Sequence, residues 1–328
     1  MSRVLVTGMG CVSGLGLDAP SAWNAVAQAR SAIRPVDVPA QGQPALVYRG
    51  LGAPAPDELH DKLLERFGRK LVSSVDRVSN LAALAVEEAL ADAGLTRGAP
   101  ELETAAIVLG SASGGNASIE AGYQRLFDAG HTSIHPLTIP RCMGSAAASH
   151  VSMVFGIKGV CHSISSACAS SAHAIEEGMH LIRAGRADLV IAGGSDASLT
   201  YGSLQGWRSL QAASEDGCRP FARNRNGTVV GEGAAVLVLE SEASARARGA
   251  QVQAEILGAG SSSDARHLTQ PDSDGAVRSI RAAYLDAGLP LSTPVLISAH
   301  GTGTILNDRA EAQALGEVFG DLLSQNLV

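Results

Sequence analysis

The sequence predicts an α/β protein that contains a duplicated unit. Helical and strand-like segments alternate along its 328 residues, and 45% of the residues are hydrophobic, enough to bury a large core. The strand-like runs are rich in Val, Ile, Leu and Ala, which is typical of strands covered on both faces. A helix ending with the same residues occurs twice, at Leu90–Leu95 and at Leu285–Leu289.

The alternation gives an ordered set of expected elements. We expect strands at 3–7, 105–110, 160–165, 189–194 and 294–298, and helices near 20–29, 77–93, 142–155 and 168–184. Gly94 and Gly185 stand where two of these helices should end, since glycine adopts the left-handed conformation that closes a helix.

The repeated helix ending suggests how the chain is divided. Aligning Asp92 with Asp286 gives an offset of 194 residues (286 − 92), and each copy is followed by a strand-like run and a small-residue turn. A match this short can also arise by chance. If the repeat is genuine, we expect a first half at residues 1–250 and part of a second at 251–328, with roughly a quarter to a third of the duplicated fold beyond Val328.

Composition excludes several classes of function. The net charge of −7, with no Lys/Arg run interleaved with aromatic residues, argues against a nucleic-acid partner. The apolar runs are far shorter than the roughly 20 residues of a membrane span, and the N-terminus lacks a secretory pattern, so we expect a cytoplasmic protein. The five cysteines are scattered without a CxxC pair, which argues against disulfides and zinc sites, and no metal or redox cofactor is expected.

Cys168 is a candidate nucleophile. It lies in Ser163–His173, between an expected strand and an expected helix, where the helix dipole and unpaired N–H groups can lower the pKa of a thiol from about 8.5 into a range of roughly 3.5–7.5. A lone cysteine is more commonly a small buried hydrophobe. The spacing alone leaves both readings open.

His300 is the histidine with the best context for catalysis. The segment His300–Thr304 follows an expected strand at its carboxyl end, where open α/β sheets bind ligands, and combines an imidazole with two hydroxyls. Such a histidine can polarise a carbonyl or stabilise a forming anion. Capping of the next helix is the alternative reading.

The segment Thr7–Ser13 resembles a dinucleotide-binding fingerprint only in part. The third glycine of GxGxxG would fall on Ser13, so the pattern fails at the position needed for close helix packing. We therefore interpret the segment as a tight turn and expect no nucleotide cofactor.

The chemistry-bearing segments together resemble the elongating β-ketoacyl-[acyl carrier protein] synthases. The resemblance follows the family's order from Val4 to Gly320 and rests on Ser165–Ser171, Ala192–Gly194, Arg219–Phe221, Gly231–Gly233, Ser262–Ala265 with His267, and His300–Thr304 with Asp308 and Glu311. It implies a thiolase-like fold, two similar halves in αβαβα layers. Its implied partners are acyl carrier protein, which brings its own phosphopantetheine, and a second subunit in a homodimer or a heterodimer.

The resemblance also implies a mechanism. Cys168 would accept an acyl group as a thioester, and His300 would assist the decarboxylation of malonyl-carrier protein, whose carbanion attacks that thioester. Substrate contacts are implied for Thr302, Thr304, Thr269, Ser113, Thr138 and Trp207, and bracing roles for Asp308 and Glu311.

Two departures from the family's pattern bear on substrate and docking. Ser113 and, across the dimer interface, Thr138 are small where the family often has a bulky aliphatic and an aromatic residue, so a deep acyl pocket is expected. The alternative is that neighbouring side chains or the partner subunit's Leu137 fill the gap, because cores rarely leave voids. The basic pair expected before Asp76 is Ser73–Ser74, which shifts the expected carrier-protein docking patch to Arg66, Arg69, Lys70 or Arg208.

Part of the implied site falls outside the sequence. The family's second histidine, its lysine and a glycine-rich loop correspond to positions after Val328, so a chain ending there is expected to condense poorly. The alternative function is a catalytically silent partner subunit, as chain-length factors are, although such partners usually lack the nucleophile.

Overall fold

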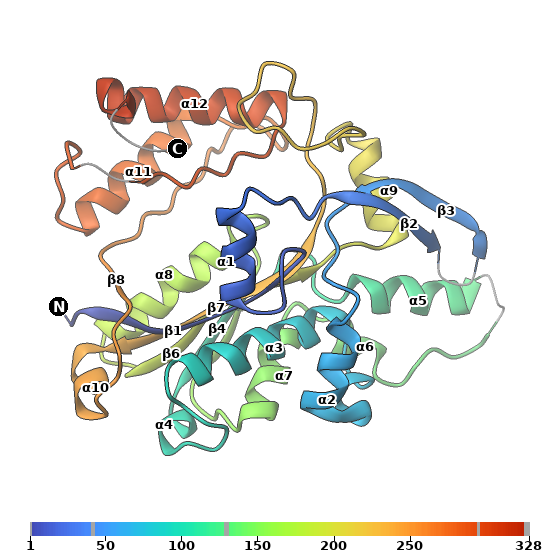
Figure 1. Cartoon of the computed structure of the whole chain (residues 1–328), viewed down its shortest axis with the longest axis horizontal. Helices are drawn as coiled ribbons and strands as arrows, with labels where there is room; N and C mark the ends of the chain where they lie inside the picture. Colours follow the sequence, from blue (N-terminus) through green and yellow to red (C-terminus); the bar gives the residue numbers. More distant parts are fainter. Residues whose placement is uncertain (1, 41–42, 128–130, 294–295, 325–328) are drawn as a thin grey trace. The chain divides into compact units, whose positions relative to one another are not determined.

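The structure is a computed structural model that describes residues 2–40, 43–127, 131–293 and 296–324 (Figure 1). The chain divides into two compact units, Met1–Gly206 with Val230–Ile256, and Trp207–Val229 with Leu257–Val328. Each unit is described by itself. The predicted division at residue 250 stays a prediction.

The first unit is built on a six-stranded mixed sheet in the order β5-β4-β6-β7-β1-β8. Strands β5, β4 and β6 run parallel to one another. The pairs β6–β7, β7–β1 and β1–β8 are antiparallel. The strands are β1 (Val4–Ser13), β4 (Ala106–Gly110), β5 (Cys161–Ile164), β6 (Leu189–Ala197), β7 (Glu232–Ser241) and β8 (Ala254–Ile256). The expected strands at 105–110, 160–165 and 189–194 are thereby confirmed.

Helices cover both faces of this sheet (Figure 1). Leu189 and Ile191 of β6 belong to the core formed with α3 (Arg77–Asp92) and α7 (Ala146–Phe155). On the opposite face, a Cβ added at Gly178 of α8 (Ser170–Arg183) would contact the side chains of Val190 and Ala192. Since strand side chains alternate between faces, β6 is buried on both sides, as its apolar run predicts.

The remaining elements of the first unit lie around the sheet. The sequence pattern did not identify the two-stranded antiparallel sheet β2 (Arg34–Ala40) and β3 (Gln43–Gly52). The other helices are α1 (Ala19–Ala27), α2 (Leu59–Val72), α4 (Pro100–Glu103), α5 (Asn116–Phe127), α6 (Thr138–Cys142), α9 (Tyr201–Ser209, whose last residues belong to the second unit) and α10 (Glu242–Ala247). The helix expected at 142–155 is α7, which begins only at Ala146, because residues 143–145 form a bend and turn after α6.

The interpretation of Thr7–Ser13 as a tight turn is wrong. The segment is the second half of β1, which runs through to Ser13. Gly8 and Gly10 are needed because β1 lies against α3: an added Cβ would come within 2.2 Å of the Ala89 carbonyl oxygen at Gly8 and 2.0 Å of the Ala85 carbonyl oxygen at Gly10. The glycines therefore allow close packing of strand and helix.

The second unit packs α11 (Ser273–Asp286) against α12 (Ile305–Phe319), which is followed by the short helix η1 (Gly320–Ser324). Val277, Ala314 and Phe319 lie in its core, and the Tyr284 and Phe319 rings meet edge to face at 5.8 Å. The expected strand at 294–298 is not formed by Leu296–Ser298, and residues 294–295 lie outside the described residues. A strand needs a paired neighbour, and the described part of this unit contains no other strand beside it.

The packing in the two units confirms the repeat. In the first unit, the Met9 N–H donates to Asp92 Oδ2 at 2.9 Å. In the second, the Ala259 N–H donates to Asp286 Oδ2 at 3.0 Å. Gly258 and Gly260 lie against α11 as Gly8 and Gly10 lie against α3, with an added Cβ 2.5 Å from the Ala287 nitrogen and 2.3 Å from the Ser279 carbonyl oxygen. The match thus extends from the helix ending to the segment packed on the helix.

The packing of α8 generates a stability prediction. A Cβ added at Gly110 would lie 2.3 Å from the Ser170 carbonyl carbon, so Gly110→Ala forces the start of α8 away from the sheet. We expect the free energy of unfolding to fall by more than about 2 kcal/mol. Gly144→Ala is the control, because nothing lies within 4 Å of its added Cβ. Urea unfolding of both variants measures this, and equal stabilities would contradict it.

A second prediction concerns His150 in α7. Its side chain is 2% exposed, neither ring nitrogen has a hydrogen-bond partner among the described residues, and burial lowers its pKa to about 4. In the unfolded chain the pKa of a histidine is about 6.5. Each pKa unit between the folded and unfolded states changes the free energy of unfolding by about 1.4 kcal/mol. Between about pH 6.5 and pH 4, acid therefore favours the unfolded state, by at most about 3.5 kcal/mol from this group.

The measurement is urea unfolding of the native protein and His150→Phe at pH 7 and pH 5. The native protein should lose more stability on acidification than the variant, because only the native chain carries the buried imidazole. The same loss in both proteins would show that His150 is not responsible.

Candidate active site

Several predicted site residues follow the carboxyl ends of the parallel strands in the first unit. The Gly110–Gly115 turn follows β4, the segment with Cys168 follows β5, and Ser198 follows β6. Carboxyl ends of parallel strands share one edge of a sheet, so these segments come together there. The Ser111 N–H, which donates to the Ile164 carbonyl oxygen at 3.0 Å, joins the first two directly.

Cys168 is exposed and lies in the turn between β5 and α8, two residues before the first residue of the helix. The strand-to-helix placement predicted for this residue is therefore present. The preceding residue, Ala167, has φ 53°, in the left-handed region that residues other than glycine rarely adopt. The turn is thus a strained connection that presents the thiol at the amino end of α8.

The other four thiols have less favourable environments for reaction. Burial raises the pKa of the Cys11 thiol, with Glu88 adding to the effect, and desolvation raises that of Cys161. The thiols of Cys142 and Cys218 donate to the carbonyl oxygens of Ile139 and Thr302, each at 3.4 Å. Cys168 alone combines exposure with a strand-to-helix turn.

Ser113 lies in a turn held by Asp196 at the end of β6. The Asp196 carboxylate accepts hydrogen bonds from the Ser111 hydroxyl at 3.2 Å and from the N–H groups of Ala112 and Ser113 at 3.0 and 3.2 Å. The Ser198 hydroxyl donates to the Ser113 Oγ at 3.1 Å. Sequence reasoning missed Asp196, although a carboxylate just after a buried strand is a recognisable signal.

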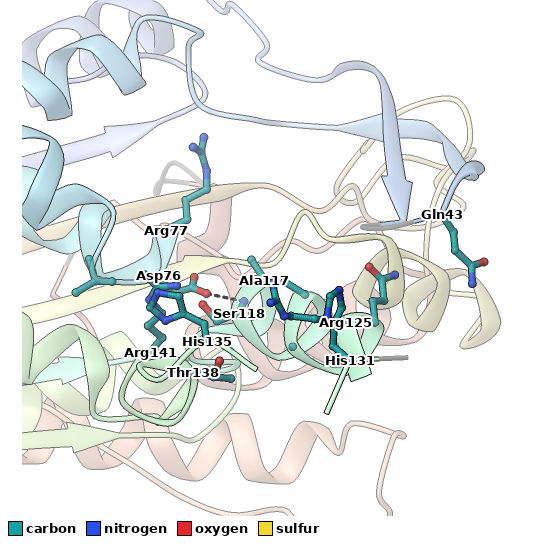
Figure 2. A pocket seen from close by; sticks show the side chains of 14 residues that line it. Gln43, Asp76, Arg77, Ala117, Ser118, Arg125, His131, His135, Thr138 and Arg141 are labelled. Atoms are coloured by element: carbon teal, nitrogen blue, oxygen red, sulfur yellow. Dashed lines mark hydrogen bonds between the residues drawn. The ribbon is translucent and has the colours of Figure 1, made fainter. Parts of the chain in front are cut away.

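Thr138 is buried and lines a cavity of about 700 Å³ between α5, α6 and the start of α3 (Figure 2). Asp76, at the cavity wall, caps α3 through the Val78 N–H and accepts the Ser118 N–H at 2.8 Å. Ser113 is not among the residues that line this cavity. The two small residues expected in the acyl pocket therefore line different surfaces of the first unit.

His300 and Gly301 form the start of a turn in the second unit that is held by Glu311 of α12. The Glu311 carboxylate accepts the His300 N–H at 2.7 Å and the Gly301 N–H at 2.9 Å. Gly301 and Gly303 have φ 49° and 75°, a left-handed backbone that glycine adopts without strain. The arrangement fixes the main chain at His300.

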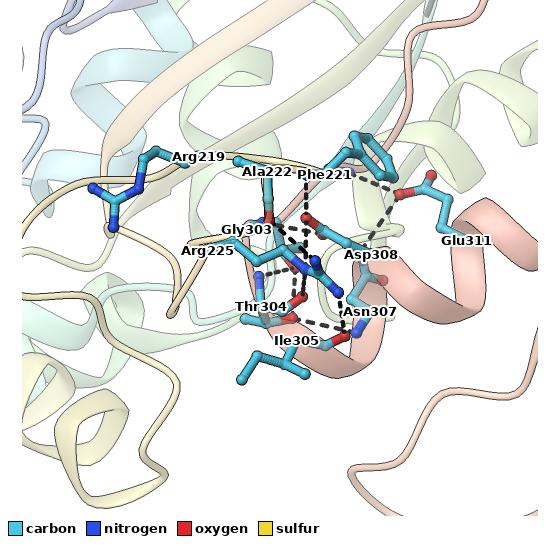
Figure 3. A network of polar contacts seen from close by, with 12 residues as sticks. Arg219, Phe221, Ala222, Arg225, Gly303, Thr304, Ile305, Asn307, Asp308 and Glu311 are labelled. Atoms are coloured by element: carbon cyan, nitrogen blue, oxygen red, sulfur yellow. Dashed lines mark hydrogen bonds and ion pairs between the residues drawn. The ribbon is translucent and has the colours of Figure 1, made fainter.

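Asp308 holds the next part of the same turn (Figure 3). It is 1% exposed and accepts the Gly303 N–H at 3.1 Å and the Phe221 N–H at 2.6 Å. Arg225 lies 3.6 Å from its carboxylate and donates to the carbonyl oxygens of Thr304 and Ile305. Sequence reasoning missed Arg225, because nothing in its local sequence shows that it meets a turn some 80 residues later.

The remaining predicted substrate residues also belong to the second unit. The hydroxyls of Thr302 and Thr304 are 2.8 Å apart, and Thr304 caps α12 by accepting the Asn307 N–H. The Thr269 N–H donates to His267 Nδ1 at 3.1 Å, and Trp207 is half-buried, with its carbonyl oxygen accepting the Ala212 N–H. Roles for these residues in substrate binding stay predictions.

Within the described ranges, no group of three or more His, Cys, Asp or Glu side chains is placed to hold a metal ion. None of the helices in the described ranges is long and apolar enough to span a membrane.

The chain is similar over nearly all its length to nodulation proteins and to 3-oxoacyl-[acyl-carrier-protein] synthases. It is 41% identical to nodulation protein E of Rhizobium sp. (strain N33) over 318 residues, and 32% identical to 3-oxoacyl-[acyl-carrier-protein] synthase 2 of Staphylococcus aureus (strain COL) over 326 residues. Each match covers 97% of this chain and 77% of the relative.

Solved structures agree with the sequence matches. The ishigamide ketosynthase/chain length factor superposes with a TM-score of 0.89 at 31% identity, covering 98% of this chain and 78% of that one. This likeness confirms the predicted thiolase-like fold class. The family model of the β-ketoacyl synthase N-terminal domain matches residues 1–245, and that of the C-terminal domain matches residues 253–328. With Cys168 at its strand-to-helix turn and the carboxylate-held turn at His300, the chain belongs to the β-ketoacyl synthase family.

Proposed function

We propose that this protein catalyses decarboxylative Claisen condensation of an acyl group held on Cys168 with malonyl-[acyl carrier protein], giving β-ketoacyl-[acyl carrier protein]. The observation that carries the proposal is the position of Cys168, exposed in the turn between β5 and α8 of a β-ketoacyl synthase. Fatty acid or polyketide synthesis is the proposed setting, and the cytoplasm is the proposed compartment.

The first step is acyl transfer to Cys168. Its thiolate attacks the carbonyl carbon of the acyl thioester on the carrier protein's phosphopantetheine, a new C–S bond forms, and the phosphopantetheine thiolate leaves and takes up the proton given up by Cys168. The amino end of α8 favours the negative charge of the thiolate and of the tetrahedral intermediate, because N–H groups in the first turn of a helix have no partner within it.

The second step joins the two carbon chains. The C–C bond to the malonyl carboxylate breaks, CO₂ leaves, and the electron pair passes into an enolate of the carrier-bound acetyl thioester. The enolate carbon attacks the acyl carbonyl on Cys168, and the Cys168 thiolate leaves. We assign His300 to stabilise the enolate oxygen by hydrogen bonding. Glu311 and Asp308 are assigned to hold the turn that carries it, through the N–H groups of His300, Gly301 and Gly303.

The proposed substrate contacts divide into two groups. The hydroxyls of Thr302, Thr304 and Thr269, with the side chain of Trp207, are proposed to meet the phosphopantetheine arm. Ser113 and, across the proposed subunit interface, the partner subunit's Thr138 are proposed to widen the acyl pocket, because small side chains replace bulky ones at those positions. The similarity to 3-oxoacyl-[acyl-carrier-protein] synthase 2 supports acyl carrier protein as the partner.

The proposed second subunit, another copy or a related chain, is supported by an exposed edge and an apolar surface. Strand β5 is an edge strand, and Cys161, His162 and Ser163 in it are exposed. Helices α5, α6 and α7, which pack on one another or on β5, expose large apolar side chains: Tyr123, Phe127, Ile139 and Met153. An edge strand beside exposed apolar side chains is typical of a surface that another chain covers.

A silent partner subunit is the second candidate function, supported by the likeness to a ketosynthase/chain length factor structure. The two candidates differ in what they require of Cys168. A condensing enzyme forms a thioester there, whereas a silent partner does not. Mass spectrometry after incubation with acyl-carrier protein separates them, since only thioester formation raises the mass by one acyl group.

The first prediction of the proposed function is that Cys168 is the most reactive thiol. Substoichiometric iodoacetamide followed by peptide mapping should label Cys168 first, because it is exposed in the strand-to-helix turn at the amino end of α8. Cys168→Ala should lose acyl transfer and condensation, each by at least about 10²-fold. Preferential labelling of Cys142 or Cys218 would reject the assignment.

The second prediction concerns acyl length at Ser113. Ser113→Ile adds several methylene equivalents to the pocket wall, and each buried CH₂ of an acyl chain contributes about 0.8 kcal/mol. We expect Cys168 acylation by long acyl-carrier proteins to fall at least about tenfold in the variant, with short chains little affected. Ser171→Ala, on α8, is the control, because the Ser171 hydroxyl has no hydrogen bond among the described residues and the change adds no bulk. Equal long-chain acylation of Ser113→Ile and native protein would show that Ser113 does not limit the pocket.

A further inference from the structure

The turn that carries Cys168 is closed by side chains with no role in the mechanism above. The Ser166 N–H donates to the Ser170 Oγ at 2.9 Å, and the Ser170 hydroxyl donates in turn to the Ala167 carbonyl oxygen at 2.6 Å. The Ser166 Oγ lies 2.7 Å from His173 Nδ1, on the first turn of α8. Three side chains therefore surround the backbone on both sides of Cys168.

This closure matters because the turn is strained. Ala167, with φ 53°, is a residue with a Cβ in the left-handed region, and such a conformation persists only where the surroundings hold it. Ser170 is 3% exposed, and its hydroxyl is already engaged both as acceptor and as donor. The Ser166–His173 contact is a separate hydrogen bond that ties the residue before Ala167 to the helix.

We propose that Ser166 and His173 are positioning residues for Cys168. Their hydrogen bond holds Ser166 against α8, keeps Ala167 in its left-handed conformation, and so fixes the Cys168 thiol at the amino end of the helix. Either tautomer of His173 can make the bond, since a hydroxyl both donates and accepts. The inference rests on the proposed function of Cys168 as the nucleophile, and neither residue contacts the reacting atoms in it.

The test uses variants that differ only in the hydroxyl. Ser166→Thr keeps the hydroxyl and Ser166→Val removes it at nearly equal volume, while His173→Phe removes the other partner. The second-order rate constant for iodoacetamide labelling of Cys168 is followed by peptide mapping from pH 6 to pH 9 in the full chain. Circular dichroism and thermal melting establish that each variant is folded.

We expect Ser166→Val and His173→Phe each to slow labelling about tenfold at pH 7, the size typical of one hydrogen bond, and to move the half-maximal pH of labelling upward. Ser166→Thr should stay within about twofold of the native rate. The double variant Ser166→Val with His173→Phe should be no slower than either single variant, because both remove the same bond. Ser171→Ala is the matched control, since its hydroxyl has no hydrogen bond among the described residues.

Three outcomes would overturn the inference: native labelling rates in folded Ser166→Val, effects that multiply in the double variant, or equal slowing in Ser171→Ala. If Ser166→Val does not fold, His173→Phe against His173→Asn, which can still hydrogen-bond Ser166, decides the same question. Failure of the proposed function gives a different result, since Cys168 in the native protein would then react no faster than Cys142. Fast native labelling that is unchanged in Ser166→Val rejects the positioning role alone.

Discussion

The close approach of α8 to the sheet is the constraint on which the candidate site depends. Gly110, the last residue of β4, and its partner Gly194 in β6 leave no room for a Cβ: added atoms would lie 2.3 Å from the Ser170 carbonyl carbon and 2.7 Å from the Ser171 Cβ. The helix therefore begins directly on the sheet edge. Because Cys168 is two residues earlier, the same contact sets where the thiol can lie.

Carboxylates hold the backbone of the turns in both units. Asp196 accepts two N–H groups of the turn with Ser113. Glu311 and Asp308 do the same for the turn from His300 to Gly303. A turn held through its N–H groups keeps its geometry without constraining the side chains it presents. The Cys168 turn differs, because the hydroxyls of Ser166 and Ser170 and the imidazole of His173 close it.

Glycine spacing connects the repeat in the sequence with the repeat in the packing. In each unit, two glycines let a segment lie directly against the helix that follows it: Gly8 and Gly10 against α3, and Gly258 and Gly260 against α11. The aspartate at the end of each helix accepts a backbone N–H from that segment. The short repeat seen in the sequence is thus one end of a larger packing unit. Gly8 and Gly10, in the segment interpreted from the sequence as a turn, and Gly258 and Gly260 in the second copy therefore all serve close packing on a helix.

The sequence by itself determined the α/β class, the strands β4, β5 and β6, the helix α3 and the strand-to-helix position of Cys168, because these depend on local periodicity, apolar runs and helix-ending glycines. Only the tertiary structure decided that Thr7–Ser13 is a strand, since that depends on pairing with β7, from Gly8↔Val238 to Ser13↔Gly233, in a part of the chain that lies far away in the sequence. Pairing also decided that Leu296–Ser298 is not a strand, for strands form only beside a partner. Asp196, Arg225 and the Ser166–His173 contact were not predicted either, because side-chain hydrogen bonds depend on distances in the folded chain that periodicity does not contain.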